Sequence, residues 1–97
     1  MHTTRDLPTP ALLLDLDVLE GNLRDMATRC AELGVRLRPH VKTHNCIEIA
    51  LGQRELGAAG ITVSTLHEAK VFADAGFDDI TWAFPLILSR IPEAVDL

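Results

Sequence analysis

Residues 38–44 read Arg38-Pro39-His40-Val41-Lys42-Thr43-His44, and nowhere else in the chain does a lysine lie between two histidines. The alternation of apolar and basic residues extends back to Val35, and period-two alternation is typical of a β-strand. We therefore expect a strand over residues 35–42. One face would carry Val35, Leu37, Pro39 and Val41, and the other Arg36, Arg38, His40 and Lys42. A row of four basic groups requires water, an anion or a polar cavity beside it.

Lys42 would end this strand just before a helix. Asn45 followed by Glu48 has the spacing of a capping box, in which each side chain satisfies backbone donors at a helix start. A lysine at the carboxyl end of a parallel strand, beside a helix N-terminus, is well placed to meet an anionic cofactor.

The rest of the chain alternates predicted strands and helices. Apolar or β-branched runs predict strands over residues 11–15, 60–63 and 79–84. Two more capping boxes, Asp17 with Glu20 and Thr65 with Glu68, predict helix starts, and Gly34, Gly57 and Gly76 predict helix ends. Residues 89–97 predict the start of a last helix, with Pro92 tolerated in its first turn.

This order indicates an α/β fold. From Val35 onward the strand–helix unit repeats at roughly twenty residues, which is too long for hairpins and suits βα units with a parallel sheet. A complete eight-stranded (β/α) barrel takes about 250 residues. The 97 residues supply about three βα units, so we expect a partial barrel of the TIM type, the N-terminal part of a larger fold.

Composition excludes several classes of function. The net charge of −5 argues against a nucleic-acid partner, and no apolar run approaches the length of about 20 residues that a membrane helix needs. The first ten residues lack the hydrophobic core of a signal peptide, which indicates a cytoplasmic protein. Cys30 and Cys46 have no metal-motif spacing and fall in predicted helices, where we expect reduced core residues.

The motif at residues 38–44 resembles the cofactor-lysine motif of the D-threonine aldolase and D-serine dehydratase group, which belongs to the alanine-racemase-like, fold type III pyridoxal-phosphate enzymes. Residues 9–17, 60–69 and 83–87 resemble that group's opening strand and helix start, its next strand and helix, and the end of its following strand. The group commonly has a lysine after the second histidine, where this chain has Asn45.

The resemblance implies a pyridoxal-phosphate-dependent lyase acting on D-configured β-hydroxy amino acids. It implies that Lys42 forms the internal aldimine with pyridoxal 5'-phosphate, and that residues 1–97 are the N-terminal part of the barrel domain, without the C-terminal β domain. The resemblance further implies a homodimer, phosphate-binding loops on later strands, and a divalent metal whose ligands lie nearer the C-terminus. No metal ligand is therefore assigned in this chain.

Three residues are expected to assist Lys42. Formation of a Schiff base needs an unprotonated amine, and a free lysine has a pKa of about 10.4. Arg38 and His40, on the same strand face, are expected to supply positive charge and to contact the cofactor. His40 and His44 flank Lys42 and are candidates for proton transfer or for hydrogen bonds to the cofactor.

Two other groups are given structural roles. Lys70, the only other lysine, is expected on the solvent side of the third helix. The pair Asp78 and Asp79 precedes a strand at the end opposite Lys42, so we expect a solvated loop there.

Two alternatives to the lyase remain open. One is an amino-acid racemase of the same superfamily, which would release neither glycine nor acetaldehyde from D-threonine. The other is a non-catalytic module that binds pyridoxal phosphate or associates with a partner. The 97-residue chain on its own is expected to be incomplete and inactive.

Overall fold

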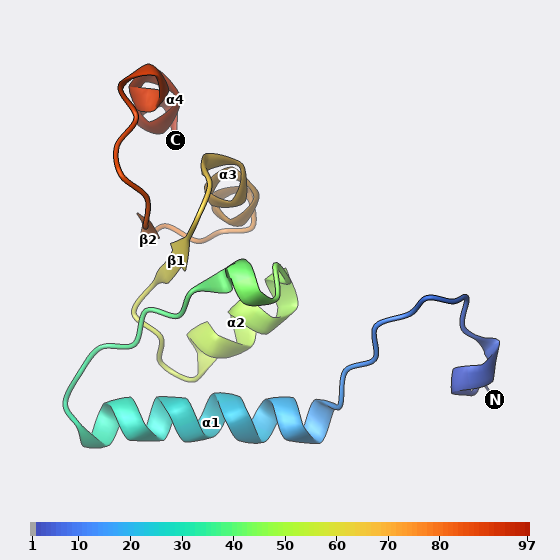
Figure 1. The fold of residues 1–97 in the computed structure, drawn as a ribbon. Coiled ribbons are helices and arrows are strands. Elements are labelled where there is room, and N and C mark those ends of the chain that lie inside the picture. Colours follow the sequence, from blue (N-terminus) through green and yellow to red (C-terminus); the bar gives the residue numbers. More distant parts are fainter. Residues whose placement is uncertain (1) are drawn as a thin grey trace.

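Four helices lie in a row in the computed structural model, which describes residues 2–97, and a small sheet lies beside the second and third helices (Figure 1). The elements are α1 (Leu16–Glu32), α2 (Ile47–Glu55), β1 (Ile61–Val63), α3 (Leu66–Asp74), β2 (Ile80–Trp82) and α4 (Ile91–Asp96). Short 3₁₀ helices form at Thr4–Asp6, Val41–Thr43 and Leu88–Arg90.

The sheet is parallel. β1 and β2 pair with Ile61 opposite Ile80 and Val63 opposite Trp82. The segment that leads to Lys42 runs along the other edge of β1, where a parallel bridge joins His40 to Thr62. The carboxyl ends of all three segments therefore lie at the same end of the sheet.

The strand expected over residues 35–42 is wrong in extent, because the ladder beside β1 is interrupted at Gly60. Leu37 O and Pro39 O accept hydrogen bonds from Ala59 N and Thr62 N, both at 2.8 Å. The two acceptors are two residues apart in sequence, whereas the two donors are three residues apart. One residue on the β1 side is therefore left out of register. After His40 the chain turns into the 3₁₀ helix Val41–Thr43 rather than continuing as a strand.

The strand expected over residues 11–15 is also wrong. None of the residues that the structure describes pairs with this segment, and Leu12 is 99% exposed. A lone extended segment has no ladder to stabilise it. Asp15 instead caps α1, where its carboxylate accepts hydrogen bonds from the backbone N–H groups of Asp17 and Val18 at 3.1 Å. The helix thus begins two residues before the start that the Asp17 box predicted.

The other local signals have mixed outcomes. The Thr65 cap is confirmed, since its Oγ1 accepts a hydrogen bond from Glu68 N at 3.0 Å. The Asn45 cap is wrong, because α2 begins after Cys46 and Asn45 takes a left-handed conformation with φ of 47°. The helix ends are confirmed by positive φ angles at Gly34, Gly57 and Gly76. The last helix is confirmed as α4, with Pro92 in its first turn.

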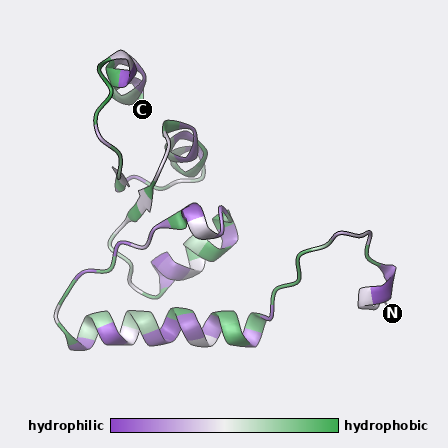
Figure 2. Cartoon of the chain, viewed as in Figure 1, coloured by the Kyte–Doolittle hydropathy of each residue, from purple (hydrophilic) through white to green (hydrophobic). Residues whose placement is uncertain are grey.

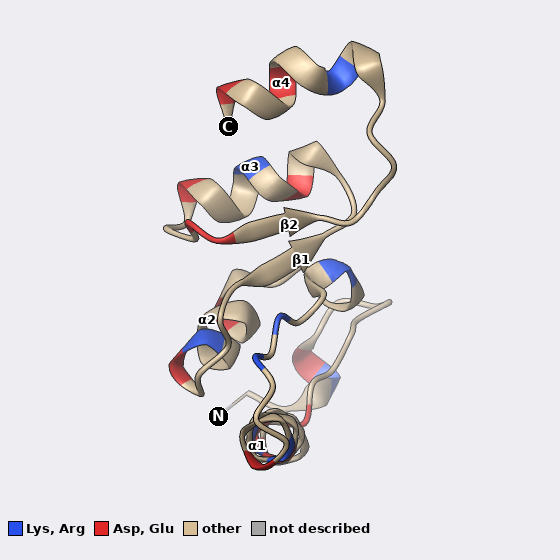
Figure 3. Cartoon of the chain, turned by 90° about the vertical axis from the view of Figure 1, so that its left-hand side faces the viewer, with Lys and Arg blue, Asp and Glu red and all other residues tan. Residues whose placement is uncertain are grey.

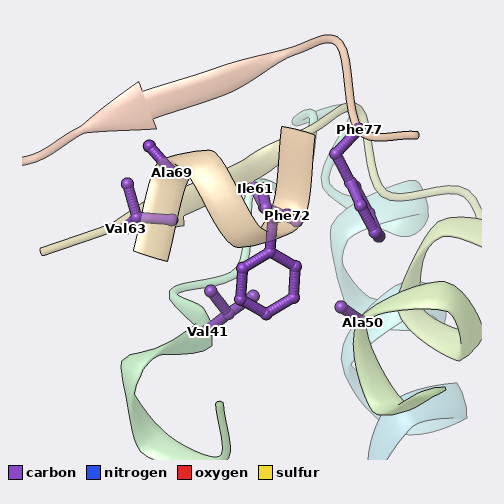
Figure 4. Close-up of a cluster of buried hydrophobic side chains, with 7 residues drawn as sticks. All are labelled: Val41, Ala50, Ile61, Val63, Ala69, Phe72 and Phe77. Atoms are coloured by element: carbon purple, nitrogen blue, oxygen red, sulfur yellow. The ribbon is translucent and has the colours of Figure 1, made fainter. Parts of the chain in front are cut away.

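The core lies between β1, α2 and α3 (Figure 4). Its buried side chains are Val41, Ala50, Ile61, Val63, Ala69, Phe72 and Phe77. Ile61 and Val63 point to the same face of β1, toward Phe72, because side chains alternate along a strand. The rings of Phe72 and Phe77 meet edge to face, with centroids 5.7 Å apart. Val41, directly before Lys42, is 0% exposed, so the core holds the backbone of the lysine turn.

Much apolar surface lies outside this core (Figure 2). Seventeen large hydrophobic side chains within residues 2–97 are exposed, including Leu12, Leu13 and Leu14. The radius of gyration is 16.1 Å, against the roughly 12.5 Å expected of a compact domain of this length. The helices α2 and α3 cover one face of the sheet, and the described residues leave the opposite face open.

Candidate functional site

The open face of the sheet is polar. His40, Thr62 and Thr81 are neighbours across the sheet, because His40 bridges to Thr62 and Thr62 pairs with Thr81. Residues paired in register point to the same face, and here that face is opposite the one formed by Ile61 and Val63. The Thr62 hydroxyl donates to Arg38 O at 3.2 Å and thereby ties β1 to the lysine segment.

Arg38 and Asp79 form an ion pair at the amino end of this face. Arg38 Nη1 and Nη2 donate to the two carboxylate oxygens of Asp79 at 2.6 and 3.0 Å. The guanidinium passes over Gly60, where a Cβ atom would lie 2.5 Å from Asp79 O and closer still to Arg38 Nη1. The hydrogen bonds from Arg38 hold the pKa of the Asp79 carboxyl below its ordinary value.

This pair bears on two expectations. The solvated loop expected at Asp78 and Asp79 is confirmed, since both residues are exposed, and the Asp79 carboxylate in addition binds Arg38 across β1. The positive charge of Arg38 is compensated by Asp79 at the end of the strands away from Lys42. Arg38 therefore fixes the segment that leads to the lysine, and its guanidinium is directed away from the lysine amine.

Lys42 lies at the carboxyl end of the same segment, in the 3₁₀ helix Val41–Thr43. In Figure 3, the Lys and Arg positions are blue, and several of them fall on the segment that runs beside β1. The Lys42 side chain is exposed, and its amine makes no ion pair or hydrogen bond with any residue from 2 to 97. Lys70 differs, because its Nζ lies 3.2 Å from Asp74 one turn along α3. The structure thus confirms the surface role expected of Lys70 and leaves the Lys42 amine free for a ligand.

The two histidines around Lys42 make similar local hydrogen bonds but have different surroundings. His40 Nδ1 accepts from Lys42 N at 3.3 Å, and no partner for its Nε2 is found within the described chain. His44 Nδ1 accepts from Cys46 N at 2.9 Å, and its Nε2 lies 3.3 Å from Gln53 Oε1 on α2. Only His40 has a ring nitrogen available to a ligand beside Lys42.

A second polar cluster lies at the carboxyl end of β1 and involves Glu68, which the sequence singled out only as part of a capping box. Glu68 Oε2 accepts from Ser64 N at 3.2 Å, Ser64 Oγ at 2.7 Å and Thr65 Oγ1 at 2.9 Å. Burial is the largest single influence on the pKa of Glu68 and raises it, but the hydrogen bonds from Ser64 and Thr65 together outweigh it and lower the pKa. The other oxygen, Oε1, is buried without a partner among the described residues.

A shallow hollow of about 600 Å³ opens beside this cluster and is lined in part by Ser64, Trp82 and Phe84. Trp82 and Phe84 are stacked with an interplanar angle of 12°, and Trp82 Nε1 donates to Ser64 O at 3.3 Å. Within residues 2–97, no three His, Cys, Asp or Glu side chains gather in a way that would hold a metal ion.

Sequence comparison identifies the family to which this arrangement belongs. Residues 14–96 match the family described as alanine racemase, N-terminal domain. The chain belongs to this family. The match includes the lysine segment, both strands and all four helices.

Three curated relatives of this alanine racemase N-terminal domain are enzymes. D-threo-3-hydroxyaspartate dehydratase of Delftia sp. (strain HT23) is 47% identical over 98% of the chain. D-threonine aldolase of Arthrobacter sp. is 50% identical over 74% of the chain, and D-serine dehydratase of Dictyostelium discoideum is 40% identical over 95%. The chain spans 25%, 19% and 24% of the lengths of these relatives, respectively.

The fold agrees with the solved structure of the Delftia dehydratase. The TM-score is 0.92 at 47% identity, with 94% of this chain and 24% of that chain covered. The chain thus has the fold of an alanine racemase N-terminal domain, with helices and a short parallel sheet, in accord with part of an α/β barrel.

None of the helices within residues 2–97 combines the length and the apolar character needed to cross a bilayer.

Proposed function

We propose that this chain is the first part of the barrel of a pyridoxal-phosphate-dependent lyase, and that Lys42 carries the cofactor. The observation that carries the proposal is the Lys42 amine. It lies at the carboxyl end of the parallel segments and is unpaired within the described chain, whereas the Lys70 amine is paired with Asp74. In barrels built from βα units, the carboxyl ends of the strands form the active-site face.

The residues present fit this cofactor. Lys42 offers the primary amine that condenses with an aldehyde carbon, and the open sheet face beside it carries the polar side chains of His40 and Thr62. Bound pyridoxal phosphate supplies an electron sink when a bond to the substrate α-carbon breaks. His40 Nε2 is placed to donate a hydrogen bond toward a ligand on this face, since its Nδ1 is occupied by Lys42 N.

The chain's own residues would divide the work as follows. Lys42 Nζ would bind the cofactor and, when released from it, would take a proton from the substrate α-carbon as the amine or return one as the ammonium group. His40 orients a polar group of the ligand through Nε2. Arg38 and Asp79 hold the lysine segment against β1 from the amino end.

The substrate class is proposed from the relatives. Their names refer to D-threo-3-hydroxyaspartate, D-threonine and D-serine, which are all D-amino acids with a hydroxyl group on the β-carbon. We propose the same class here. A dehydratase would remove water and release ammonia and a 2-oxo acid, whereas an aldolase would split the bond between the α- and β-carbons and release glycine.

The barrel is proposed to be completed by further βα units. Residues 11–15 expose three consecutive leucines, and the helices within residues 2–97 cover one face of the sheet. Parallel sheets are generally buried on both sides, and exposed apolar surface on this scale marks an interface. The relatives are about four times as long as this chain, in accord with such completion.

The test uses the whole protein that carries this chain, incubated with pyridoxal phosphate and D-threonine or D-serine. An aldolase yields glycine and acetaldehyde from D-threonine, and a dehydratase yields pyruvate and ammonia from D-serine. We expect one of these outcomes, with loss of product in Lys42→Ala and retention in Lys70→Ala.

Appearance of the L-enantiomer alone would identify an amino-acid racemase instead, which the description of the family also allows. Equal activity in Lys42→Ala and the unaltered protein would contradict the role proposed for Lys42.

A further inference from the structure

The backbone between Lys42 and α2 makes a tight turn. His44 N and Asn45 N both approach Val41 O, at 3.3 and 2.8 Å, and Asn45 adopts a left-handed φ of 47°. Asparagine tolerates this conformation better than most residues. The position of Lys42 relative to α2 therefore depends on what holds these few residues.

His44 holds this turn through both ring nitrogens. A backbone N–H group can only donate, so His44 Nδ1, which lies 2.9 Å from Cys46 N, must be the acceptor. The ring proton is then on Nε2, which donates to Gln53 Oε1 at 3.3 Å. The imidazole is half-buried. Its two hydrogen bonds connect the start of α2 to the second turn of that helix.

At the start of α2 His44 binds the backbone N–H of Cys46, the N-cap residue, whose own side chain makes no capping hydrogen bond. The first N–H groups of a helix have no partner within the helix. Cys46 Sγ donates to Glu48 Oε2 instead. His44 therefore satisfies one of the backbone donors at the start of α2, that of Cys46.

We propose that His44 is a positioning residue for the cofactor lysine, which acts by tying the Lys42 turn to α2 through Cys46 N–H and Gln53. This inference rests on the function proposed above and deepens it. Val41, buried in the core, anchors the turn before the lysine, and His44 anchors it after the lysine. His44 touches neither substrate nor cofactor in this account, which separates it from His40.

Variants of His44 and Gln53 separate the two hydrogen bonds. His44→Ala removes both. His44→Asn keeps an acceptor at the same distance from the backbone, since Asn Oδ1 commonly accepts from the N–H two residues ahead, but it does not reach Gln53. Gln53→Leu removes only the second bond. His67→Ala is the matched control, because His67 is an exposed histidine on α3 with no hydrogen bond within the described chain.

The first measurement is the affinity of the whole protein for pyridoxal phosphate, followed by its absorbance. We expect His44→Ala to weaken binding about fivefold, the equivalent of one net hydrogen bond of about 1 kcal/mol. His44→Asn should recover most of the affinity, and His67→Ala should leave it unchanged. Unchanged affinity in His44→Ala, or no recovery in His44→Asn, would overturn the proposal.

The second measurement does not depend on the cofactor. In ¹⁵N NMR of the unaltered protein, His44 Nδ1 should give the signal of an unprotonated ring nitrogen and Nε2 that of a protonated one. A protonated Nδ1 would overturn the tie itself. If the tie is observed but the unaltered protein does not bind pyridoxal phosphate, the proposed function fails, and the role of His44 toward a cofactor lysine fails with it. If His44→Ala does not fold, the comparison of Gln53→Leu with Gln53→Glu, which keeps an oxygen acceptor, gives the affinity test.

Discussion

Arg38 and Lys42 lie on one segment, but their charges meet different surroundings. The Arg38 guanidinium is paired with Asp79 across Gly60, whereas the Lys42 amine has no partner within residues 2–97. A charge that is already paired fixes structure, and an unpaired one in an open polar site is available to a ligand. Arg38 and Asp79 are therefore supporting groups of the candidate site, and Lys42 is the group proposed to react.

Acid should weaken the pair between Arg38 and Asp79. The folded-state pKa of Asp79 lies below its ordinary value of 3.8, so the pair contributes stability above about pH 4 and loses it as pH falls through the folded-state pKa. We expect urea unfolding between pH 6 and 2.5 to show a decrease in stability below pH 4 that is smaller in Asp79→Asn. Parallel curves for both proteins would contradict this assignment.

Gly60 should not tolerate a side chain. A Cβ atom there would collide with Arg38 Nη1 and Asp79 O, so we expect Gly60→Ala to lower the free energy of unfolding by about 1–3 kcal/mol. Gly21 in α1 is the matched control. A Cβ at Gly21 meets no atom within 4 Å, so Gly21→Ala should raise the free energy of unfolding by about 0.5–1 kcal/mol. Denaturant titration of both variants gives the comparison, and equal effects would refute it.

At the scale of elements, local signals predicted the helices better than the strands. The Thr65 cap was predicted correctly because all the groups of that cap lie within four residues. The helix ends at the three glycines were predicted correctly for the same reason. The strands depend on partners distant in sequence. The run at 11–15 finds no partner among the described residues, and the ladder at 35–42 breaks at Gly60, a mismatch that alternation alone does not reveal.

In the candidate site, too, local features were predictable from the sequence and contacts between distant residues were not. The exposed lysine beside buried Val41 was predictable from the motif and its alternation. The pairing of Arg38 with Asp79, 41 residues away, was not, because nothing in the local pattern links them. The hydrogen bond from Cys46 N to His44 was missed because the sequence predicted that the neighbouring Asn45 would cap the helix.

The start of α3 offers a test at this scale. Thr65→Ala removes the acceptor for Glu68 N and one donor to the Glu68 carboxylate. We expect a loss of about 1 kcal/mol in the free energy of unfolding. Thr65→Ser, which retains the hydroxyl group, should lose much less. If both variants unfold at the same denaturant concentration as the unaltered protein, the cap does not stabilise α3.

At the scale of the whole molecule, the chain is open and extended and does not form a compact domain. Its helices cover one face of the sheet, and its apolar surface is spread over residues 11–15 and the region after β2 (Figure 2). In an α/β barrel this arrangement is completed when further strands pair with the free edges. The further strands and helices of the proposed barrel would therefore bury apolar surface that lies outside the small core.

A substitution at Leu12 tests whether further βα units complete the barrel. The Leu12 side chain is 99% exposed in this structure, and substitutions at truly solvated positions usually change stability by less than about 0.5 kcal/mol. We expect Leu12→Asp in the whole protein to lower the free energy of unfolding by on the order of 2 kcal/mol, because barrel packing would bury this leucine. A neutral effect in denaturant titration would contradict the completion.

The most direct test of the central claim is to find which lysine carries the cofactor. The whole protein is incubated with pyridoxal phosphate, reduced with borohydride to fix the bond, digested and analysed by mass spectrometry. We expect the reduced pyridoxyl group on the peptide that contains Lys42 and none on the peptide that contains Lys70. An unlabelled Lys42 peptide, in a protein that binds the cofactor, would contradict this expectation.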